Sequence, residues 1–434
     1  MTQALRVGVA GLGTVGAALI AQVARQREAL AARCGRPIEV VAVCARSRTK
    51  NRGVDLKSMK WFSDPVALAR EGDIDVFVEL IGGAGDPARS AIAAALGSGK
   101  SVVTANKALL AKHGVKLAAL AEKHHVALNF EAAVGGAVPI VKTLREGLAG
   151  NAIDRIYGIL NGTCNYILTR MEQDKMAFAQ CLQEAQRLGY AEADPTFDIE
   201  GHDTAQKLSI LASLAFGSKV DQRAIYVEGI SSIAPADLAA ADELGYRVKL
   251  LGVAVKTPKG IEQRVHPTMV RKDSAIAQVM GVTNAVTIDA DGIDPLTLVG
   301  PGAGGAATAS AVLSDIGDVA RGVRTAPFGR PTARLTSVRK APMQRHEGGY
   351  YIRLQARDKP GTAATIAKRL AQQDISLESI VQRHGKDERP KNGSVPVILI
   401  TYATTEDAVR KALAAVGRDR VIFGRPQVIR IEKN

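Results

Sequence analysis

A glycine-rich loop directly after the first apolar run constrains the fold of this chain most strongly. Gly11, Gly13 and Gly16 have the spacing G-x-G-x-x-G, between the apolar run 5–10 and the first helical pattern. The first glycine permits a tight turn, the second lets backbone approach a pyrophosphate, and the third lets the helix pack on the strand. The helix N-terminus offers free N–H groups to the phosphates. A dinucleotide site is therefore predicted at Gly11, Gly13, Thr14, Val15 and Gly16; a tight turn without a ligand is the alternative.

Short apolar runs alternate with longer helical patterns over the first 130 residues. Strands are predicted at 5–10, 38–44, 75–80, 101–104 and 126–130, and helices at 15–33, 87–98 and 107–123. Continuous apolar strands separated by helices are typical of a parallel sheet that is covered on both faces. The fold class is therefore α/β, and residues 1–131 are predicted to form a doubly wound Rossmann domain.

The order of elements changes in the remainder of the chain. Helices come first and strands later in 132–321, which indicates a separate α+β unit for substrate binding and dimerisation. The stretch 322–348 is rich in proline and arginine and has no acidic residue before Glu347, so we expect a linker. Residues 349–434 show the order βαββαβ, a split βαβ layout that predicts a third unit.

Composition and charge narrow the classes of partner. The net charge is +14, but the basic residues are spread along the chain and only 4% of residues are aromatic, so no nucleic-acid partner is expected. No apolar run reaches the roughly 18 residues that span a bilayer, and the N-terminus lacks a signal-peptide pattern. The cysteines lie far apart without CxxC spacing. A reduced, cytoplasmic protein is therefore expected.

The loop after the second predicted strand bears on the choice of cofactor. An NAD-binding domain usually places an acid there to hold the ribose 2′-hydroxyl, but this chain has Arg46, Arg48 and Lys50 instead. Basic side chains suit a 2′-phosphate through charge-assisted hydrogen bonds. NADP is therefore the predicted cofactor, with Arg46 as a contact. NAD remains possible, and a solvated basic loop is the alternative.

An acidic segment at 190–207 holds the strongest candidate for proton transfer. Five carboxylates crowd into twelve positions that Pro195 and Gly201 interrupt, which indicates an irregular loop rather than a surface helix. Asp203 could cap the next helix, with Lys207 one turn later on the same face. A lysine beside carboxylates can transfer a proton to an alkoxide, and the carboxylates could hold a substrate ammonium. The alternative is an acidic loop with one surface ion pair.

Taken together, these and further sequence blocks resemble bacterial homoserine dehydrogenase of the long form, which carries a C-terminal ACT domain. The resemblance covers nearly the whole chain, and the block at 189–207 is its most specific part. The blocks are GLGTVG at 11–16, ELIGG at 79–83, TANK at 104–107, NGTCNY at 161–166, GYAEADPTFDIEGHDTAQK at 189–207, GAGGAATASAV at 302–312 and RDKPG at 357–361. One departure is Ala306-Ala307, where a proline is often expected.

The resemblance implies reversible reduction of L-aspartate 4-semialdehyde to L-homoserine by NAD(P)H, in threonine and methionine biosynthesis. In the matching positions Lys207 is the proton donor and acceptor, and Lys107 faces both nicotinamide and substrate. The implied substrate-binding residues are Glu192, Asp198 and Asp203. The implied cofactor contacts, besides the glycine loop, are Thr104, Lys107, Gly189 and Gly304.

The resemblance also implies a cation and an effector. A monovalent cation, usually Na⁺, would be bound at Glu131, Val134, Gly136 and Val138 through one carboxylate and backbone carbonyls, and oxygen ligands suit a hard cation. The turn at 357–361 would belong to an ACT domain that binds L-threonine for feedback inhibition, although a dimerisation module without an effector remains an alternative. A homodimer through the central unit, or a homotetramer, is expected.

Two other functions remain open on the sequence alone. An acylating semialdehyde dehydrogenase would use a cysteine thiolate, for which Cys164 is the candidate, but no histidine lies near it in sequence. A non-catalytic sensor would bind NADP and an amino acid without turnover. The presence of both Lys107 and Lys207 argues against a sensor, because a sensor needs no proton donor.

Overall fold

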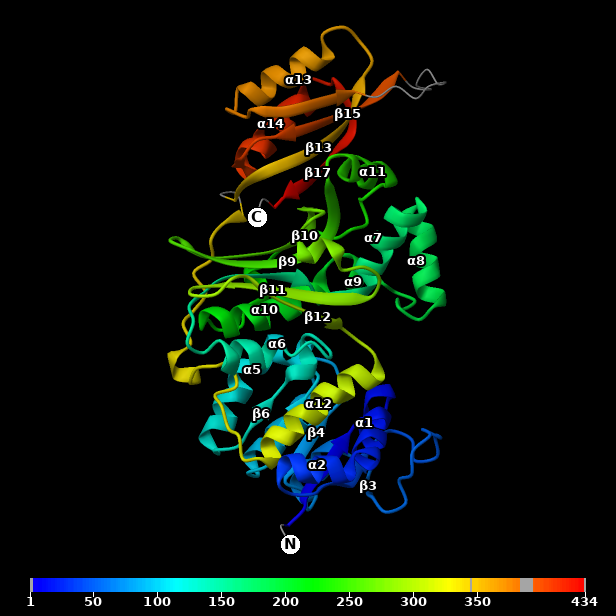
Figure 1. Ribbon diagram of the computed structural model, residues 1–434, viewed down its shortest axis with the longest axis vertical. Coiled ribbons are helices and arrows are strands. Elements are labelled where there is room, and N and C mark those ends of the chain that lie inside the picture. The colour runs from blue at the N-terminus through cyan, green and yellow to red at the C-terminus, as the bar shows by residue number, and fades with distance from the viewer. Residues whose placement is uncertain (1–2, 344–345, 383–392, 433–434) are drawn as a thin grey trace.

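Two β-sheets, one above the other along the longest axis of the molecule, organise the computed structural model (Figure 1). The structure describes residues 3–343, 346–382 and 393–432. Figure 1 shows the N-terminal unit at one end, the central unit in the middle and the C-terminal unit at the other end. The N-terminal, central and C-terminal units therefore follow each other along the longest axis in the same order as along the chain.

The N-terminal sheet is entirely parallel and has the strand order β3-β2-β1-β4-β5-β6. Its strands are β1 (Leu5–Ala10), β2 (Ile38–Cys44), β3 (Lys60–Phe62), β4 (Val76–Glu79), β5 (Ser101–Thr104) and β6 (Leu128–Asn129). The strand order reverses between β1 and β4, and ligands of such sheets bind beyond the carboxyl ends of the strands at that point. The predicted doubly wound α/β fold is confirmed, and β3 is an addition to it.

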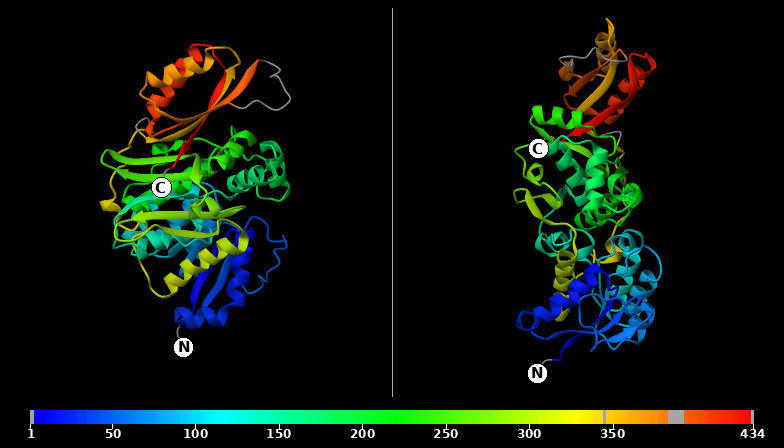
Figure 2. Two further views of the ribbon diagram at one scale, coloured as in Figure 1. Left: turned by 45° about the horizontal axis from the view of Figure 1, so that its top comes forward. Right: turned by 90° about the vertical axis from the view of Figure 1, so that its right-hand side faces the viewer.

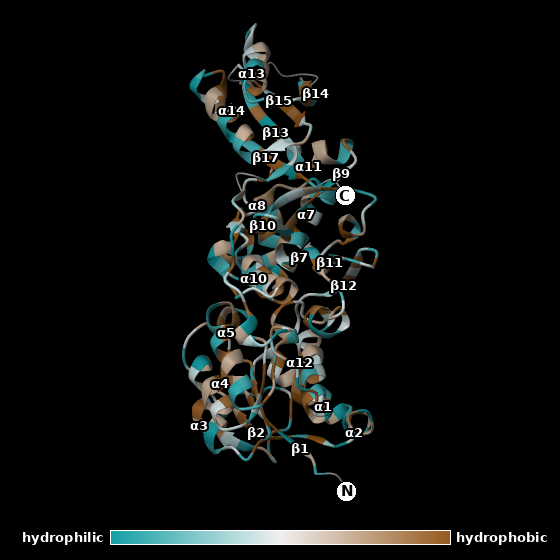
Figure 3. Ribbon diagram, turned by 90° about the vertical axis from the view of Figure 1, so that its left-hand side faces the viewer, coloured by the Kyte–Doolittle hydropathy of each residue, from teal (hydrophilic) through white to brown (hydrophobic). Residues whose placement is uncertain are grey.

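Helices cover both faces of this sheet, and one of them comes from late in the chain. They are α1 (Thr14–Arg25), α2 (Arg27–Cys34), α3 (Pro65–Glu71), α4 (Ala88–Gly97), α5 (Lys107–Lys123) and α12 (Gly305–Ala320). The continuous helix predicted at 15–33 is wrong, because the backbone of Gln26 leaves the helical region and separates α1 from α2. Helix α12 lies along α1 (Figure 2). Val312 and Ile316 of α12 share an apolar cluster with Leu19 of α1. Figure 3 shows hydrophilic residues on α2, of which Arg27, Glu28 and Arg33 are exposed.

The second sheet runs through both the central and the C-terminal units, in the order β12-β11-β7-β9-β10-β17-β13-β15-β14. Its central strands are β7 (Ile153–Ile159), β9 (Tyr246–Thr257), β10 (Gly260–Arg271), β11 (Thr283–Ala290) and β12 (Leu296–Pro301). The central helices are α6 (Ile140–Lys142), α7 (Gly162–Asp174), α8 (Phe178–Arg187), α9 (Thr196–Ile199), α10 (His202–Phe216) and α11 (Pro235–Glu243). A two-residue strand, β8 (Tyr226–Val227), pairs with β10.

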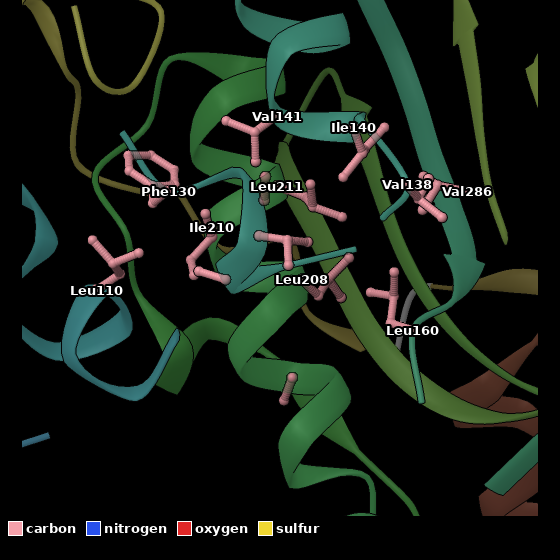
Figure 4. Close-up of a cluster of buried hydrophobic side chains, with 14 of the residues drawn as sticks. Leu110, Phe130, Val138, Ile140, Val141, Leu160, Leu208, Ile210, Leu211 and Val286 are labelled. Atoms are coloured by element: carbon pink, nitrogen blue, oxygen red, sulfur yellow. The ribbon is translucent and has the colours of Figure 1, made fainter. Parts of the chain in front are cut away.

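Helix α10 is the buried helix of the central unit and carries the predicted proton donor. Its residues Leu208, Ile210 and Leu211 pack against Phe130 and Leu160 in the largest apolar cluster (Figure 4). Burial of several large aliphatic side chains, each contributing about 2 kcal/mol, fixes the helix in position. The first turn of α10 is thereby held at the boundary between the two sheets.

The C-terminal unit confirms the predicted βαββαβ order apart from one two-residue strand. Its elements are β13 (Glu347–Arg357), α13 (Thr362–Ala371), β14 (Leu377–Gln382), β15 (Ser394–Thr401), β16 (Thr404–Thr405), α14 (Glu406–Arg418) and β17 (Ile422–Ile431). Strand β17 also pairs with β10 in parallel, with Arg430 opposite Thr268 and Ile431 opposite Met269. The C-terminal unit is therefore joined to the central sheet by backbone hydrogen bonds.

The stretch predicted as a linker is held against the folded units. Phe328 is completely buried, and its ring lies 5.3 Å from that of Phe130. Thr336 and Lys340 form isolated β-bridges with Ser218 and Ile261. This part of the chain therefore contributes to packing between units.

Strand β9 holds a buried lysine, Lys249, with which no carboxylate of the described residues pairs. Lys249 is 1% exposed, and its Nζ donates hydrogen bonds to Asn165 Oδ1 (3.0 Å) and to the carbonyl of Val279 (2.5 Å). Burial, and after it the charge of Arg247, lowers the pKa of Lys249 to about 7. The neighbouring Glu172 is paired with Arg247 instead. Neutral amine is thus the form that the folded protein favours above pH 7.

Replacement of this lysine is expected to change how stability depends on pH. Between pH 7 and 10.5 the unfolded chain binds a proton at Lys249 that the folded chain lacks, so the stability of the parent protein rises with pH relative to Lys249→Met. We expect the difference in unfolding free energy to grow by about 4 kcal/mol over that range. Urea denaturation at several pH values measures it, with the exposed Lys256→Met on the same strand as control. A difference that stays constant with pH would contradict the expectation.

Candidate functional site

The acidic segment folds into the short helix α9 and the first turn of α10. Gly201 occupies the N-cap position of α10 with a φ of 82°, which favours glycine. The expectation that Asp203 caps this helix is therefore wrong: Asp203 lies inside the first turn and its carboxylate binds other groups. Lys207 follows one turn later on the same face, as predicted.

The Asp203 carboxylate lies between two lysines. Its Oδ1 is 3.2 Å from Lys107 Nζ, and its Oδ2 is 2.9 Å from Lys207 Nζ. Burial alone raises the pKa of Asp203, but the two ammonium groups and the Asn161 amide more than offset this and hold its pKa at about 2. The group is therefore an anion that balances two cations brought together from α5 and α10.

Lys207 has two of its three N–H donors occupied. One points to Asp203 and another donates to the carbonyl oxygen of Leu160 at 2.6 Å. Its side chain is only 11% exposed, whereas that of Lys107 is 35% exposed. An ammonium group has three donors, so one N–H of Lys207 is left for a ligand.

Asn161 connects the two carboxylates of the segment. Its Nδ2 donates to Asp203 Oδ2 (2.9 Å) and to Asp198 Oδ1 (2.8 Å), while its Oδ1 accepts the N–H of Cys164 and so caps α7. Burial, and then the charge of Asp203, raises the pKa of Asp198. Our reading of the sequence assigned no role to Asn161, although an asparagine directly before a helical pattern is a capping signal.

The remaining predicted residues of the segment lie outside this cluster. Glu192 is exposed, and its carboxylate makes no hydrogen bond or ion pair within the part of the chain that the structure describes. Its loop is held by Thr163, which donates to the carbonyl of Tyr190, and by Gln186, which donates to that of Glu192. Gly189 is exposed as well, with a φ of 75°. The structure therefore does not bring Glu192 into contact with the lysine pair.

A buried carboxylate that the sequence analysis did not single out positions Lys107. Glu79 ends the apolar strand β4 and accepts hydrogen bonds from the N–H groups of Ile81 (2.8 Å) and Gly82 (2.9 Å). It also accepts the hydroxyl hydrogen of Thr104 at 2.6 Å, and Thr104 Oγ1 in turn accepts the N–H of Asn106. The side chain of Asn106 caps α5. Thr104, predicted as a cofactor contact, therefore has its hydroxyl committed within the protein.

The glycine loop has the geometry that a dinucleotide requires. A Cβ at Gly11 would lie 2.4 Å from the carbonyl oxygen of Leu80, and one at Gly16 would lie 2.1 Å from that of Gly11. At Gly13 such an atom would meet nothing within 4 Å, and no side chain caps α1. The backbone N–H groups at this helix start thus face open space where a phosphate can approach.

A second glycine loop faces the first. Gly304 is the N-cap residue of α12 with a φ of 111°, and a Cβ at Gly305 would come within 2.7 Å of Thr14 Cγ2. The N-termini of α1 and α12 therefore lie next to each other. Both loops and the lysine pair lie at the carboxyl edge of the parallel sheet.

The basic loop after β2 is fastened to the glycine loop. Arg52 donates from Nε to the carbonyl of Leu12 at 3.1 Å and from Nη1 to that of Lys50 at 2.7 Å. Arg46 and Arg48 are exposed and form no ion pair among the described residues. Their charges remain available to an anionic ligand beside the glycine loop.

The four positions implied for a cation include one deeply buried carboxylate. Glu131 is 2% exposed, and its two oxygens accept the N–H groups of Val141 and Lys142, both at 2.8 Å. Burial raises the pKa of Glu131. The backbone of Val134, Gly136 and Val138 forms the turn that follows. No group of three or more His, Cys, Asp or Glu side chains within the described ranges is arranged for a metal ion.

Cys164 lacks the environment of a nucleophile. It is completely buried, and its thiol donates to the carbonyl of Asp198 at 3.2 Å. Burial raises its pKa well above the ordinary value, and the charges of Asp198 and Asp203 raise it further. The thiolate that an acylating dehydrogenase needs is therefore disfavoured here.

No helix in the described part of the chain has the length and apolar character needed to cross a membrane.

Three family models match the chain: "Homoserine dehydrogenase, NAD binding domain" at residues 11–131, "Homoserine dehydrogenase" at 139–316 and "ACT domain" at 350–418. Among curated relatives, homoserine dehydrogenase of Neisseria gonorrhoeae is 44% identical over 95% of both chains. That of Pseudomonas aeruginosa is 43% identical over 99% of both.

Solved structures agree with these matches. A crystal structure of a homoserine dehydrogenase from Thiobacillus denitrificans is 41% identical, covers 99% of both chains and has a TM-score of 0.92. A hyperthermophilic archaeal homoserine dehydrogenase in complex with NADPH is 28% identical, with a TM-score of 0.62, and covers 73% of this chain and 97% of that one.

Proposed function

The chain belongs to the homoserine dehydrogenase family, and from this premise we propose that it reversibly reduces L-aspartate 4-semialdehyde to L-homoserine with NADPH. The family makes it an oxidoreductase acting on a CH–OH group. The observation that carries the proposed mechanism is the Asp203 carboxylate between Lys107 and Lys207, at the sheet edge where the two glycine loops meet. The bound nicotinamide supplies or accepts the hydride.

Lys207 is the proposed proton donor and acceptor at the reacting oxygen. Asp203 and the Leu160 carbonyl fix its Nζ, and its third N–H is free to reach the substrate. In the reduction a proton leaves this ammonium for the forming alkoxide; in the oxidation the amine takes it back. The charge of Lys107 suits the substrate carboxylate or the developing alkoxide. Asp198 and Asp203 are the proposed anions for the substrate ammonium, whereas Glu192 lies outside their cluster.

Loss of Lys207 is expected to remove turnover but not cofactor binding. We expect Lys207→Ala to lower kcat for homoserine oxidation, followed at 340 nm, by about 10²- to 10⁴-fold, because a positioned proton-transfer group contributes that much. NADPH binding, measured by fluorescence, should stay near that of the parent protein. The exposed Lys112→Ala on α5 is the matched control.

Near-normal turnover of Lys207→Ala would refute its role. A parent protein that binds NADP⁺ and homoserine without turning them over would refute the proposed reaction and favour the sensor.

NADP is the proposed cofactor because the exposed Arg46 and Arg48 lie on a loop that Arg52 fastens beside the glycine loop. Arg46→Ala is expected to raise KM for NADP⁺ by about tenfold, through loss of a charge-assisted hydrogen bond to the 2′-phosphate, and to leave KM for NAD⁺ unchanged. Steady-state kinetics with each cofactor checks this. Equal effects on both cofactors would argue against a 2′-phosphate contact.

A monovalent cation, Na⁺, is proposed at Glu131, Val134, Gly136 and Val138. The donor set fits, because each Glu131 oxygen accepts one N–H and keeps a second lone pair, and backbone carbonyls suit a hard cation. Na⁺ should raise the thermal unfolding temperature and the turnover relative to tetramethylammonium at equal ionic strength. Identical values in both salts would contradict the site.

The ACT unit is proposed to bind L-threonine as a feedback effector. In the turn at 357–361 the N–H groups of Arg357, Asp358 and Lys359 already donate to backbone carbonyls. Gly361, with a φ of 87°, is the N-cap residue of α13 and provides no side-chain cap, so the start of this helix is the part of the turn that can offer N–H groups to a ligand. A homodimer through the central unit or a homotetramer is the proposed assembly, which sedimentation velocity distinguishes from a monomer.

The proposed location is the cytoplasm, where the four buried free thiols stay reduced.

A further inference from the structure

The short helix α9 ends against a backbone segment, residues 228–231, that follows β8. The N–H of Ile230 in this segment donates to the carbonyl of Ile199, the last residue of α9, at 2.8 Å. The hydroxyl of Ser231 donates to Glu200 Oε1 at 2.7 Å. The end of α9 is therefore fastened to this segment by one backbone and one side-chain hydrogen bond.

Gly229, the residue before these two donors, packs directly on the end of α9. A Cβ at this position would lie 2.4 Å from the carbonyl oxygen of Ile199 and 2.5 Å from Glu200 Cα. Carbon atoms in contact lie about 3.5–4.0 Å apart, so no side chain fits here. The φ of Gly229 lies outside the left-handed region that favours glycine. The contact with α9, rather than the backbone conformation, therefore requires glycine at this position.

The segment 228–231 is held firmly on its other side. The N–H of Glu228 donates to the carbonyl of Val265 on β10 at 2.8 Å, and the Glu228 carboxylate pairs with Arg430 of β17, which is 2% exposed. Ile230 is completely buried in the largest apolar cluster. Displacement of the segment would break an ion pair of a buried guanidinium or move a buried isoleucine, and both changes are costly.

Helix α9 is the side of this contact that can move. None of its four residues is buried, whereas most residues of α10, including Asp203 and Lys207, are buried. A side chain at position 229 would therefore displace α9 and with it Asp198, while Asp203 and Lys207 keep their places. Asp198 Oδ1 accepts a hydrogen bond from Asn161 Nδ2 at 2.8 Å, which such a displacement would lengthen.

We propose that Gly229 is a positioning residue for the substrate: its lack of a side chain lets α9 pack closely on the segment 228–231 and thereby sets where Asp198 meets the substrate ammonium. A misplacement on the order of 1 Å in a positioning group can change a rate or an affinity many-fold. This inference rests on the proposed function, because it takes Asp198 as an anion for the homoserine ammonium.

Steady-state kinetics of homoserine oxidation tests this role. Gly229→Ala is expected to raise KM for homoserine by about tenfold and to change kcat by less than about threefold, because the displaced group binds the substrate and the proton donor stays in place. KM for NADP⁺ should stay unchanged, since the glycine loops do not contact α9. Gly150→Ala is the matched control: it lies in an exposed turn, where a Cβ would meet nothing within 4 Å.

A milder variant removes only the side-chain contact between the segment and α9. Ser231→Ala should raise KM for homoserine by about threefold, through loss of the one hydrogen bond that holds Glu200. Ser232→Ala is its control, because this neighbouring hydroxyl is exposed and makes no hydrogen bond among the described residues. Thermal unfolding shows whether each variant is folded, and Ser231→Ala decides the question if Gly229→Ala does not fold.

An unchanged KM for homoserine in the folded Gly229→Ala variant would overturn the inference. A lower kcat without a higher KM would overturn it as well, because that result indicates a purely structural role. A parent protein that does not oxidise homoserine would contradict the proposed function itself, so the two failures remain distinguishable.

Discussion

One carboxylate shared by two ammonium groups fixes the arrangement of the candidate site. Lys107 begins a helix of the Rossmann unit and Lys207 lies on the buried helix of the central unit, and both are held by Asp203. Two cations without this anion would repel each other across the unit boundary. Because the two ammonium groups hold the pKa of Asp203 at about 2, its carboxylate is an anion at neutral pH and attracts both lysines.

Positioning residues behind this trio give the lysines a defined direction. Glu79, Thr104 and Asn106 form a chain of hydrogen bonds that sets the start of α5 and hence the place of Lys107. On the other side, Asn161 caps α7 and holds both Asp198 and Asp203. Each of these groups is polar and buried, so an unmet hydrogen bond would be costly. These residues thus position the two lysines through hydrogen bonds, and they are not themselves the proposed proton donor.

The sequence predicted well what depends on local periodicity and poorly what depends on contacts between distant segments. Strands such as Leu5–Ala10 and the helix Lys107–Lys123 agree with their predicted bounds, because their apolar patterns are continuous. Strand β3 has only three residues, and α12 consists mainly of small residues. Neither segment therefore shows a clear hydrophobic periodicity in the sequence. The hydrogen bonds of Glu79 to Thr104 and of Asn161 to Asp198 join residues 25 or more positions apart, and no local pattern reveals these contacts. The pairing of β17 with β10 is equally invisible in the sequence.

The central claim is that the ammonium of Lys207 delivers its proton to the substrate oxygen. A crystal structure of the chain with NADP⁺ and homoserine bound tests this most directly. The account predicts Lys207 Nζ within hydrogen-bonding distance of the homoserine hydroxyl, about 2.7–3.2 Å, while it keeps its contacts to Asp203 and Leu160. A structure in which that nitrogen points into solvent, with another group on the hydroxyl, would contradict the account.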